Sequence, residues 1–243
     1  MVYIKQFMNK GTLYLIPVPL GPSAIDAVLP TAVRDQAKQL KYFVAENAKS
    51  ARAFLKSLPS DTPLQQIVIE ELSEHTPAST LPNLLAPLLA GQDAGLISEA
   101  GCPAVADPGA NLVALAQRTG IRVVPMIGPS SILLALMGSG LSGQNFAFHG
   151  YLPAKEDERQ KKLRELEKDS RQEKRTQIFI ETPYRNRQML ETLVKTCADS
   201  TRVCVATDLS LDNESIITRT PAEWRRQGLP EIDRRPTVFL LQA

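Results

Sequence analysis

The sequence predicts two α/β domains, the first built on a parallel sheet and the second on a mixed sheet. In the first half of the chain, short apolar runs alternate with helical patterns five times, which is typical of a parallel sheet with helical crossovers. In the last third, strand-like runs follow one another with short connections, which favours antiparallel or mixed pairing. The change of pattern near Ile127 divides the chain into predicted domains at 1–126 and 127–243.

The first half is expected to contain five strands, at about 12–18, 41–45, 66–72, 94–98 and 121–125. Prolines directly after the first strand forbid further ladder hydrogen bonds, so that strand has to end there. Ser23 is then suited to cap a helix. The next helix, over 48–58, carries basic residues that we interpret as a solvated surface, and a Leu-rich helix runs from Thr76 to Gly91.

The stretch 94–132 contains the most informative loop of the chain. Its strand is followed by eleven residues with two Gly and two Pro, more than a strand-to-helix connection requires. Asp107 is expected to cap the following helix, with Pro108 at its first position and Gly120 at its end. Loops at the carboxyl ends of parallel strands bind ligands in open α/β sheets. The loop is therefore a ligand-site candidate, the alternative being a rigid surface connection. The turn 128–131 follows the neighbouring strand and is a second candidate.

Ser130 precedes a helix that ends in the glycines of 138–143. That string matches GxGxxG, but a dinucleotide site needs a strand before it and a helix after it, whereas here a helix comes first. The glycines are therefore interpreted as a helix end. The charged segment 155–175 is interpreted as a solvated helix at a flap or dimer edge, an RNA-contacting helix being the alternative. Further strands are expected at 146–153, 176–180, 202–206, 214–219 and 236–241, with helices from Met189 to Val194 and near Trp224.

Composition and residue counts argue against several classes of function. With 43% hydrophobic and 22% charged residues the chain is an ordinary globular one, and its net charge of +2 does not by itself indicate nucleic-acid binding. The odd cysteine count without CxxC spacing argues against a disulfide framework. The only histidines, His75 and His149, are far apart in the sequence and lie in no metal-ligand pattern, which argues against metal chemistry and a Ser-His-Asp triad. No stretch is apolar enough to span a membrane and the N-terminus is not a convincing signal peptide, so a cytoplasmic location is expected.

Five strings carry a resemblance to a known family through their order and spacing. They are GTLYLIPVPLG at 11–21, LISEAGCPAVADPG at 96–109, VVPMIGPSS at 123–131, FAFHGYLP at 146–153 and IETPYR at 180–185. Together they resemble the tetrapyrrole-methylase-fold methyltransferases, in particular the branch typified by the ribosomal small-subunit RNA ribose 2′-O-methyltransferase. The most specific string is the central loop, where the family has a GTPxxxDPG-like sequence.

This resemblance implies S-adenosylmethionine as the methyl donor, bound in a cleft between the two domains, with no metal and usually within a homodimer. Carried over by position, it implies donor contacts at Leu20, Ser98, Gly101, Cys102, Val105, Ser131, Ile132, Glu181, Thr182, Thr207, Asp208 and Thr237. Cys102 stands where relatives have Asp or Thr, so its backbone rather than its thiol is the expected contact.

Two strings depart from the RNA-methylating branch. That branch has an EDTR-like string where this chain has Glu46-Asn47-Ala48-Lys49, and a Leu-Thr-Lys string where this chain has Leu209-Ser210-Leu211. The expected acceptor is ribosomal RNA (at a ribose 2′-O) or another RNA. The alternatives are a small molecule such as a tetrapyrrole precursor, and a non-catalytic protein that only binds the donor. No catalytic base is assigned, and the candidates near strand ends are Glu46, Glu99, Glu181, Asp208 and Glu214.

Overall fold

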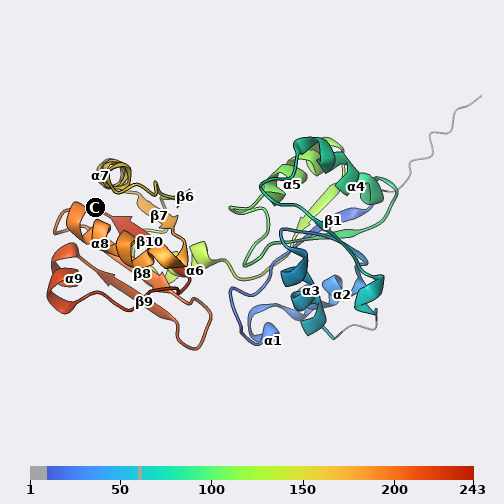
Figure 1. The fold of residues 1–243 in the computed structure, drawn as a ribbon, viewed down its shortest axis with the longest axis horizontal. Coiled ribbons are helices and arrows are strands. Elements are labelled where there is room, and N and C mark those ends of the chain that lie inside the picture. Colours follow the sequence, from blue (N-terminus) through green and yellow to red (C-terminus); the bar gives the residue numbers. More distant parts are fainter. Residues whose placement is uncertain (1–9, 60–61) are drawn as a thin grey trace, which may run out of the picture. The chain divides into compact units, whose positions relative to one another are not determined.

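The chain folds into two compact units, which meet in the sequence between Pro129 and Ser130. The computed structural model describes residues 10–59 and 62–243. Each unit contains its own five-stranded sheet with helices packed against it (Figure 1). The prediction of two α/β folds, the first with a parallel sheet and the second with a mixed one, is confirmed.

The N-terminal sheet is parallel throughout and has the strand order β3-β2-β4-β1-β5. Its strands are β1 (Thr12–Ile16), β2 (Tyr42–Ala45), β3 (Val68–Glu71), β4 (Ala94–Ile97) and β5 (Arg122–Pro125). Ile16 and Ala45, the last residues of β1 and β2, both lie beside Ile97. The loops that follow these strands therefore leave the sheet at one edge, as the sequence predicts for a ligand site.

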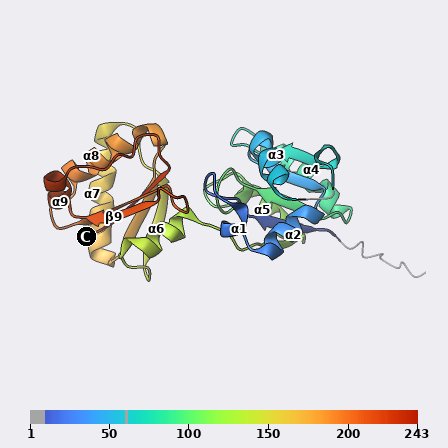
Figure 2. The same cartoon turned by 90° about the horizontal axis from the view of Figure 1, so that it is seen from below.

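Helices cover both faces of the N-terminal sheet (Figures 1 and 2). They are α1 (Ile25–Val28), α2 (Thr31–Gln39), α3 (Ala48–Ser57), α4 (Leu81–Leu89) and α5 (Gly109–Arg118), with 3₁₀ turns at Leu64–Gln66 and Ala78–Thr80. Successive strand residues point to opposite faces. Phe43 accordingly joins the apolar cluster formed with α2 and α3, whereas Val44 joins the cluster formed with α4 and α5.

Three predicted helix starts in this unit are wrong. The helix after β1 is split at Pro30 into α1 and α2, and Ser23 caps neither, since Ala24 precedes α1 and offers no side-chain cap. The Leu-rich helix begins at Leu81, because a 3₁₀ turn precedes it. In the third case Pro108 occupies the N-cap and α5 begins at Gly109. The Asp107 carboxylate still accepts a hydrogen bond from the Gly109 N–H at 2.8 Å, so its capping chemistry remains.

The C-terminal sheet is mixed, with the strand order β6-β7-β10-β8-β9. Its strands are β6 (Phe146–Tyr151), β7 (Thr176–Ile180), β8 (Arg202–Thr207), β9 (Ser215–Arg219) and β10 (Thr237–Gln242). Only β6 and β7 pair in parallel, and the other pairs are antiparallel. One face packs against α7 (Glu156–Glu173), α8 (Asn186–Thr196) and α9 (Pro221–Gln227). The helix α6 (Ser131–Ser139) contacts β8, β9 and β10.

The helix expected within 155–175 is confirmed as α7, but the interpretation that it is solvated all round is wrong, because one face of α7 belongs to the core. Leu163 is completely buried and Leu166 nearly so, and both join the main apolar cluster of this unit. Arg159 is buried as well and donates hydrogen bonds to the Ala154 carbonyl and to Thr192. The spacing of these buried positions follows one helix face. Only a few apolar residues mark this face among many charged ones, so the composition of the segment does not reveal it.

The glycine string 138–143 contains the end of α6. Gly140 adopts a left-handed conformation (φ 68°) at the C-cap of α6, which confirms that the glycine string ends a helix. Within residues 10–59 and 62–243, no helix has both the length and the apolar character that a membrane crossing requires. The interpretation that the N-terminus is no signal peptide concerns a segment whose first nine residues lie outside the described part.

Candidate functional site

The loop after β4 is folded onto the loop after β1. Gly101 and Val18 exchange two backbone hydrogen bonds, of 3.0 and 3.1 Å, and the Ser98 hydroxyl donates to the Gly101 carbonyl at 3.0 Å. Gly101 has a φ of +73°, and a Cβ added there would lie 3.1 Å from the Leu20 side chain. The Ser98 hydroxyl and the Gly101 N–H are therefore engaged inside the protein, and these residues shape the loop.

The tip of this loop is held in an unusual backbone conformation. Ala104 and Ala106 both have positive φ angles, of 65° and 60°, which non-glycine residues rarely adopt. The Asp107 carboxylate accepts hydrogen bonds from the Ala104 and Gly109 N–H groups. Burial raises the pKa of Asp107, and those two N–H groups act against the rise. Val105, between the two strained residues, is half exposed at the tip. Strain of this kind persists where the surroundings fix it, and it is frequent at ligand sites.

Cys102 is the next loop residue after Gly101, and its thiol faces the protein. Its Sγ donates a hydrogen bond to the Pro129 carbonyl at 3.4 Å. Burial raises the pKa of the thiol above its usual value, so that the thiolate is disfavoured at neutral pH. Cys102 therefore lacks the properties of a nucleophile.

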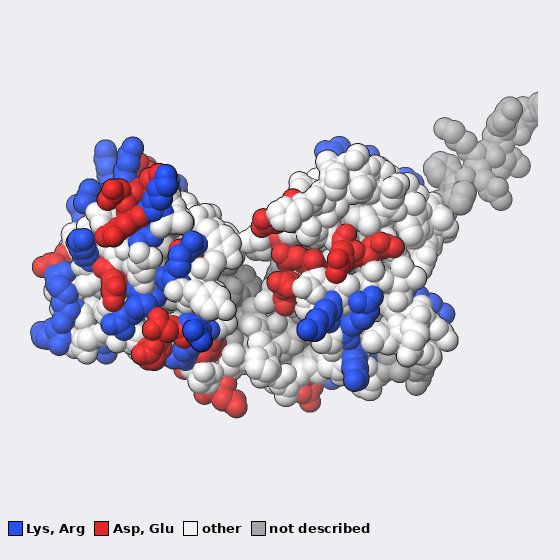
Figure 3. All heavy atoms as spheres, in the orientation of Figure 1, with Lys and Arg blue, Asp and Glu red and all other residues white. Residues whose placement is uncertain are grey.

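Acidic side chains gather at the same edge of the N-terminal sheet. Figure 3 shows a group of carboxylates on one face of this unit. Burial is the main cause that raises the pKa of Glu46, and the negative charges of Glu99, Asp107 and Glu74 raise it further, whereas the Glu99 N–H opposes them. A carboxylate with a raised pKa binds a proton more readily than an ordinary one. Glu99 is exposed and accepts a weak hydrogen bond from Ser50 at 3.4 Å.

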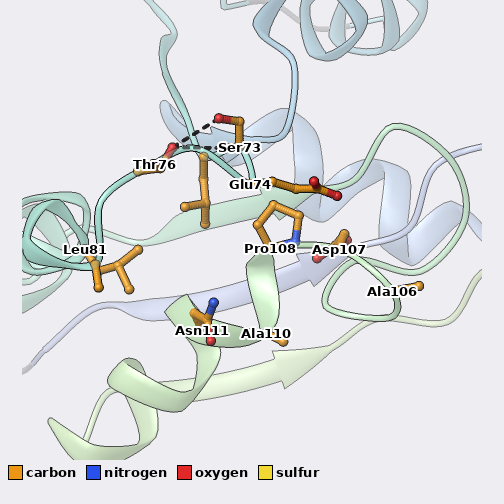
Figure 4. A pocket seen from close by; sticks show the side chains of 11 residues that line it. Ser73, Glu74, Thr76, Leu81, Ala106, Asp107, Pro108, Ala110 and Asn111 are labelled. Atoms are coloured by element: carbon orange, nitrogen blue, oxygen red, sulfur yellow. Dashed lines mark hydrogen bonds between the residues drawn. The ribbon is translucent and has the colours of Figure 1, made fainter. Parts of the chain in front are cut away.

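A pocket of about 580 Å³ opens beside this group (Figure 4). Ser73, Glu74 and Thr76 line it from the segment after β3, and Asp107 and Asn111 line it from the start of α5. None of the predicted donor residues lines it, so the sequence reasoning missed this pocket. The available signal was the polar run directly after β3, because β3 ends at the same edge as β2 and β4.

In the C-terminal unit, sheet register brings the predicted site residues together. Thr207, the last residue of β8, pairs with Thr237, the first of β10, and their hydroxyls lie 3.3 Å apart. Val238 pairs with Ile180, which places Glu181 and Thr182 at the same edge. Ser131 and Ile132, both half-buried, are the first residues of α6, whose N-cap Ser130 accepts a hydrogen bond from Leu133.

Two carboxylates at this edge are buried, and they differ in how completely they are paired. Asp208 accepts hydrogen bonds from Arg235 Nε at 2.7 Å and from Asn213. Glu181 is 5% exposed, and its Oε1 accepts from the Thr182 N–H at 2.7 Å and from Arg185 at 2.6 Å. Its Oε2 is buried and has no hydrogen-bond partner among the described residues. Glu214 is exposed and accepts from the Ser210 N–H, so it closes a turn.

The predicted donor residues thus form two groups. Leu20, Ser98, Gly101, Cys102 and Val105 belong to the N-terminal unit, and the other seven belong to the C-terminal unit. The predicted cleft between the domains stays a prediction. In the part of the chain that the structure describes, no cluster of three or more His, Cys, Asp or Glu side chains is suited to hold a metal ion.

Comparison with known proteins gives consistent matches over most of the chain. The family model for tetrapyrrole (corrin/porphyrin) methylases matches residues 15–224. The chain is 32% identical over 216 residues to ribosomal RNA small subunit methyltransferase I of Pseudomonas aeruginosa, with 89% of this chain and 72% of that protein covered. It is 30% identical over 233 residues to the protein of the same name from Xylella fastidiosa, with 96% and 81% covered.

Among solved structures the similarity concerns the fold. The methyltransferase CobJ superposes with a TM-score of 0.62 at 16% identity, covering 96% of this chain and 94% of that one. The cobalt precorrin-4 methyltransferase CbiF gives a TM-score of 0.57 at 14% identity, covering 95% and 94%. The relatives found by sequence and the neighbours found by structure are all named as methylases or methyltransferases.

Proposed function

This chain belongs to the tetrapyrrole (corrin/porphyrin) methylase family, and we propose that within this family it methylates the RNA of the small ribosomal subunit. It is a methyltransferase, and S-adenosylmethionine is its methyl donor. The observation that carries the RNA substrate is the identity of about 30% to small-subunit rRNA methyltransferases over nearly the whole chain. The structural neighbours CobJ and the cobalt precorrin-4 methyltransferase CbiF share only 14–16% identity and support the fold alone.

The residues at the edge of the C-terminal sheet fit the donor. Glu181 keeps a carboxylate oxygen buried without a hydrogen-bond partner among the described residues, which is unfavourable unless a ligand supplies a donor. S-adenosylmethionine carries ribose hydroxyls and an ammonium group, which can supply one. We infer that Glu181 binds the donor, with Thr182, Thr207, Thr237 and the start of α6 around it. The Asp208 carboxylate accepts hydrogen bonds from Arg235 and Asn213, so its role is to hold the loop after β8 in place.

In the N-terminal unit, we propose that the loop 98–109 contributes shape and backbone contacts to the donor site. Ser98 and Gly101 are bonded internally, so their role is to hold Leu20, Cys102 and Val105 in place. The positive φ angles of Gly101, Ala104 and Ala106 and the Asp107 hydrogen bonds fix the loop before a ligand arrives. Such pre-organisation lowers the entropy lost on binding.

The transfer of a methyl group is an in-line displacement, which needs an aligned acceptor and a group that removes its proton. When bound, the donor supplies a methyl group on a positively charged sulfur. We propose Glu46 as the proton acceptor, because it is partly buried among other carboxylates and its pKa is raised. The other candidates are less suited to the role. Asp208 and Glu214 have fixed hydrogen-bond partners, Glu181 is assigned to the methyl donor, and Glu99 is exposed.

The two departures from the RNA-methylating branch now have structural roles. Asn47 caps α3, its side chain accepting from the Lys49 and Ser50 N–H groups, so the segment 46–49 starts a helix at the site edge. Leu209 is buried and Ser210 has a φ of 67°, which makes 209–211 a tight turn. Both segments follow strands, β2 and β8, so we propose that these changes affect how the methyl acceptor is bound. We also propose the ribose 2′-oxygen as the position of methylation.

A small-molecule acceptor is the second candidate, and the pocket beside Asp107 is the observation that favours it. We also propose that the protein forms a homodimer and is located in the cytoplasm, where small ribosomal subunits are found.

The test measures donor binding by calorimetry and then the transfer of labelled methyl groups to small ribosomal subunits from a strain lacking the gene. Donor binding with no transfer to RNA would leave the small-molecule and non-catalytic alternatives, and no donor binding would contradict the account of the site.

A further inference from the structure

Tyr184 stands out at the edge of the C-terminal sheet because its ring is 79% exposed. It belongs to the 3₁₀ turn Pro183–Arg185, directly after Glu181 and Thr182. This exposure leaves the ring available to a partner, and aromatic rings such as that of Tyr are enriched at contact surfaces.

A cation lies over this ring. The Arg234 guanidinium is 5.8 Å from the centre of the Tyr184 ring, within the range of a cation–π interaction. Arg234 is exposed, and no ion pair found within the described part of the chain involves it. The Arg234 charge is therefore available to an anionic partner.

The backbone holds Tyr184 and Arg234 together. The Arg234 N–H donates to the Pro183 carbonyl at 3.1 Å, and the Asn186 side chain donates to the Arg235 carbonyl at 2.6 Å. Arg235 is fixed in turn, because it donates to Asp208, to the Glu231 carbonyl and to the Asn213 carbonyl. Arg234 adopts a φ of +59°, an uncommon conformation that these contacts maintain.

We propose that Tyr184 and Arg234 form a platform for a single-stranded segment of the RNA substrate, with a base stacked on the ring and a phosphate near the guanidinium. Exposed bases in RNA loops are commonly recognised by stacking on aromatic rings and arginine planes. The fixed loop makes this platform available before binding. Tyr184 and Arg234 are positioning residues, since they lie beside the proposed donor site and take no part in the transfer itself. The inference rests on the proposed RNA substrate.

The test uses the full chain and small ribosomal subunits from a strain lacking the gene. Tyr184→Leu and Arg234→Gln are expected to raise the KM for subunits at least about fivefold while kcat changes little, because stacking contributes equally before and during the transfer. Tyr184→Phe keeps the ring and is expected to recover most of the affinity. The donor dissociation constant, measured by calorimetry, should not change in any of these variants.

Two matched controls separate the platform from general effects. Phe146→Leu removes an exposed ring at the start of β6, at the opposite edge of the sheet, and Arg226→Gln removes an exposed charge on α9. Both should behave like the wild type. An unchanged KM in folded Tyr184→Leu, a donor affinity that falls together with subunit affinity, or a change of oligomeric state without loss of RNA affinity would overturn the platform. If the wild type itself transfers no methyl group to subunits, the proposed function fails first, which is a distinguishable result.

Discussion

At the scale of single residues, Glu46 is the side chain whose surroundings best suit proton transfer. Burial and the neighbouring carboxylates disfavour its ionised form in the folded state, which raises its pKa. A carboxyl group of this kind stabilises the fold when protonated, and that contribution is lost as the pH rises through its folded pKa. The ionised Glu46 should therefore be slightly unfavourable for stability at neutral pH, and useful for catalysis.

Glu46→Gln should have opposite effects on stability and activity. At pH 7 we expect a higher Tm, because the uncompensated charge is gone, and a kcat reduced about a hundredfold, because the base is gone. The Tm difference from the wild type should shrink below the ordinary pKa range of glutamate. Glu173→Gln, an exposed carboxylate at the end of α7, is the control and should change neither quantity. Unchanged kcat in Glu46→Gln would remove Glu46 from the reaction.

Gly101 and Cys102 give a second test at this scale. Gly101→Val should weaken donor binding and destabilise the fold by about 1–3 kcal/mol, since a β-branched residue is strained at a φ of +73° and approaches Leu20. Cys102→Ser should change donor affinity little, because a hydroxyl can donate to the Pro129 carbonyl as the thiol does. Calorimetry and thermal unfolding measure both effects. Loss of donor binding in the serine variant would show that the thiol itself matters.

At the scale of elements, strands and helices could be located from the sequence where apolar runs and turn residues mark their ends. The strands β4 and β5 were located closely, because an apolar run followed by turn residues marks each of them. The helix starts at Ser23 and Thr76 were misjudged, since 3₁₀ turns and a proline compete with side-chain caps there. The role of α7 was missed because two leucines suffice for a buried face when Arg159 is also buried.

Leu163→Ala tests the new view of α7 as part of the core. The side chain is completely buried, so its truncation should reduce the free energy of unfolding by about 2–5 kcal/mol. Arg164→Ala, at the neighbouring exposed position, should change it little. Urea denaturation of both variants provides the measurement. If Leu163→Ala were as stable as the wild type, α7 would be a surface helix that does not contribute to the core.

The site itself was only partly accessible to prediction. The family resemblance, rather than a local pattern, grouped Glu181, Thr207 and Thr237 in advance, and the register of the C-terminal sheet brings them to one edge. The Glu181 Oε2, which has no hydrogen-bond partner within the described part of the chain, and the pocket beside Asp107 both depend on side-chain packing between distant segments, which no local sequence pattern records. The platform residue Arg234 likewise owes its place to the long-range contact with Pro183.

At the scale of the whole molecule, the exposed apolar face of α6 bears on assembly. Leu133 and Met137 lie one helical turn apart and are 51% and 79% exposed within the single chain. We expect a homodimer in solution and expect Met137→Glu to shift it toward monomer in analytical ultracentrifugation. Gln172→Glu, which adds the same charge at an exposed position of α7, is the control. A wild type that sediments as a monomer would contradict this expectation.

The proposed methyl acceptor is small-subunit RNA, and nucleotide mass spectrometry of ribosomal RNA identifies the nucleotide that carries the methyl group. In a strain lacking the gene, the small-subunit RNA should lose one methylated nucleotide, with the methyl group on a ribose 2′-oxygen. The wild-type gene should restore that nucleotide, and the gene carrying Glu46→Gln should restore it poorly. Small-subunit RNA with an unchanged set of methylated nucleotides in the deletion strain would contradict the account.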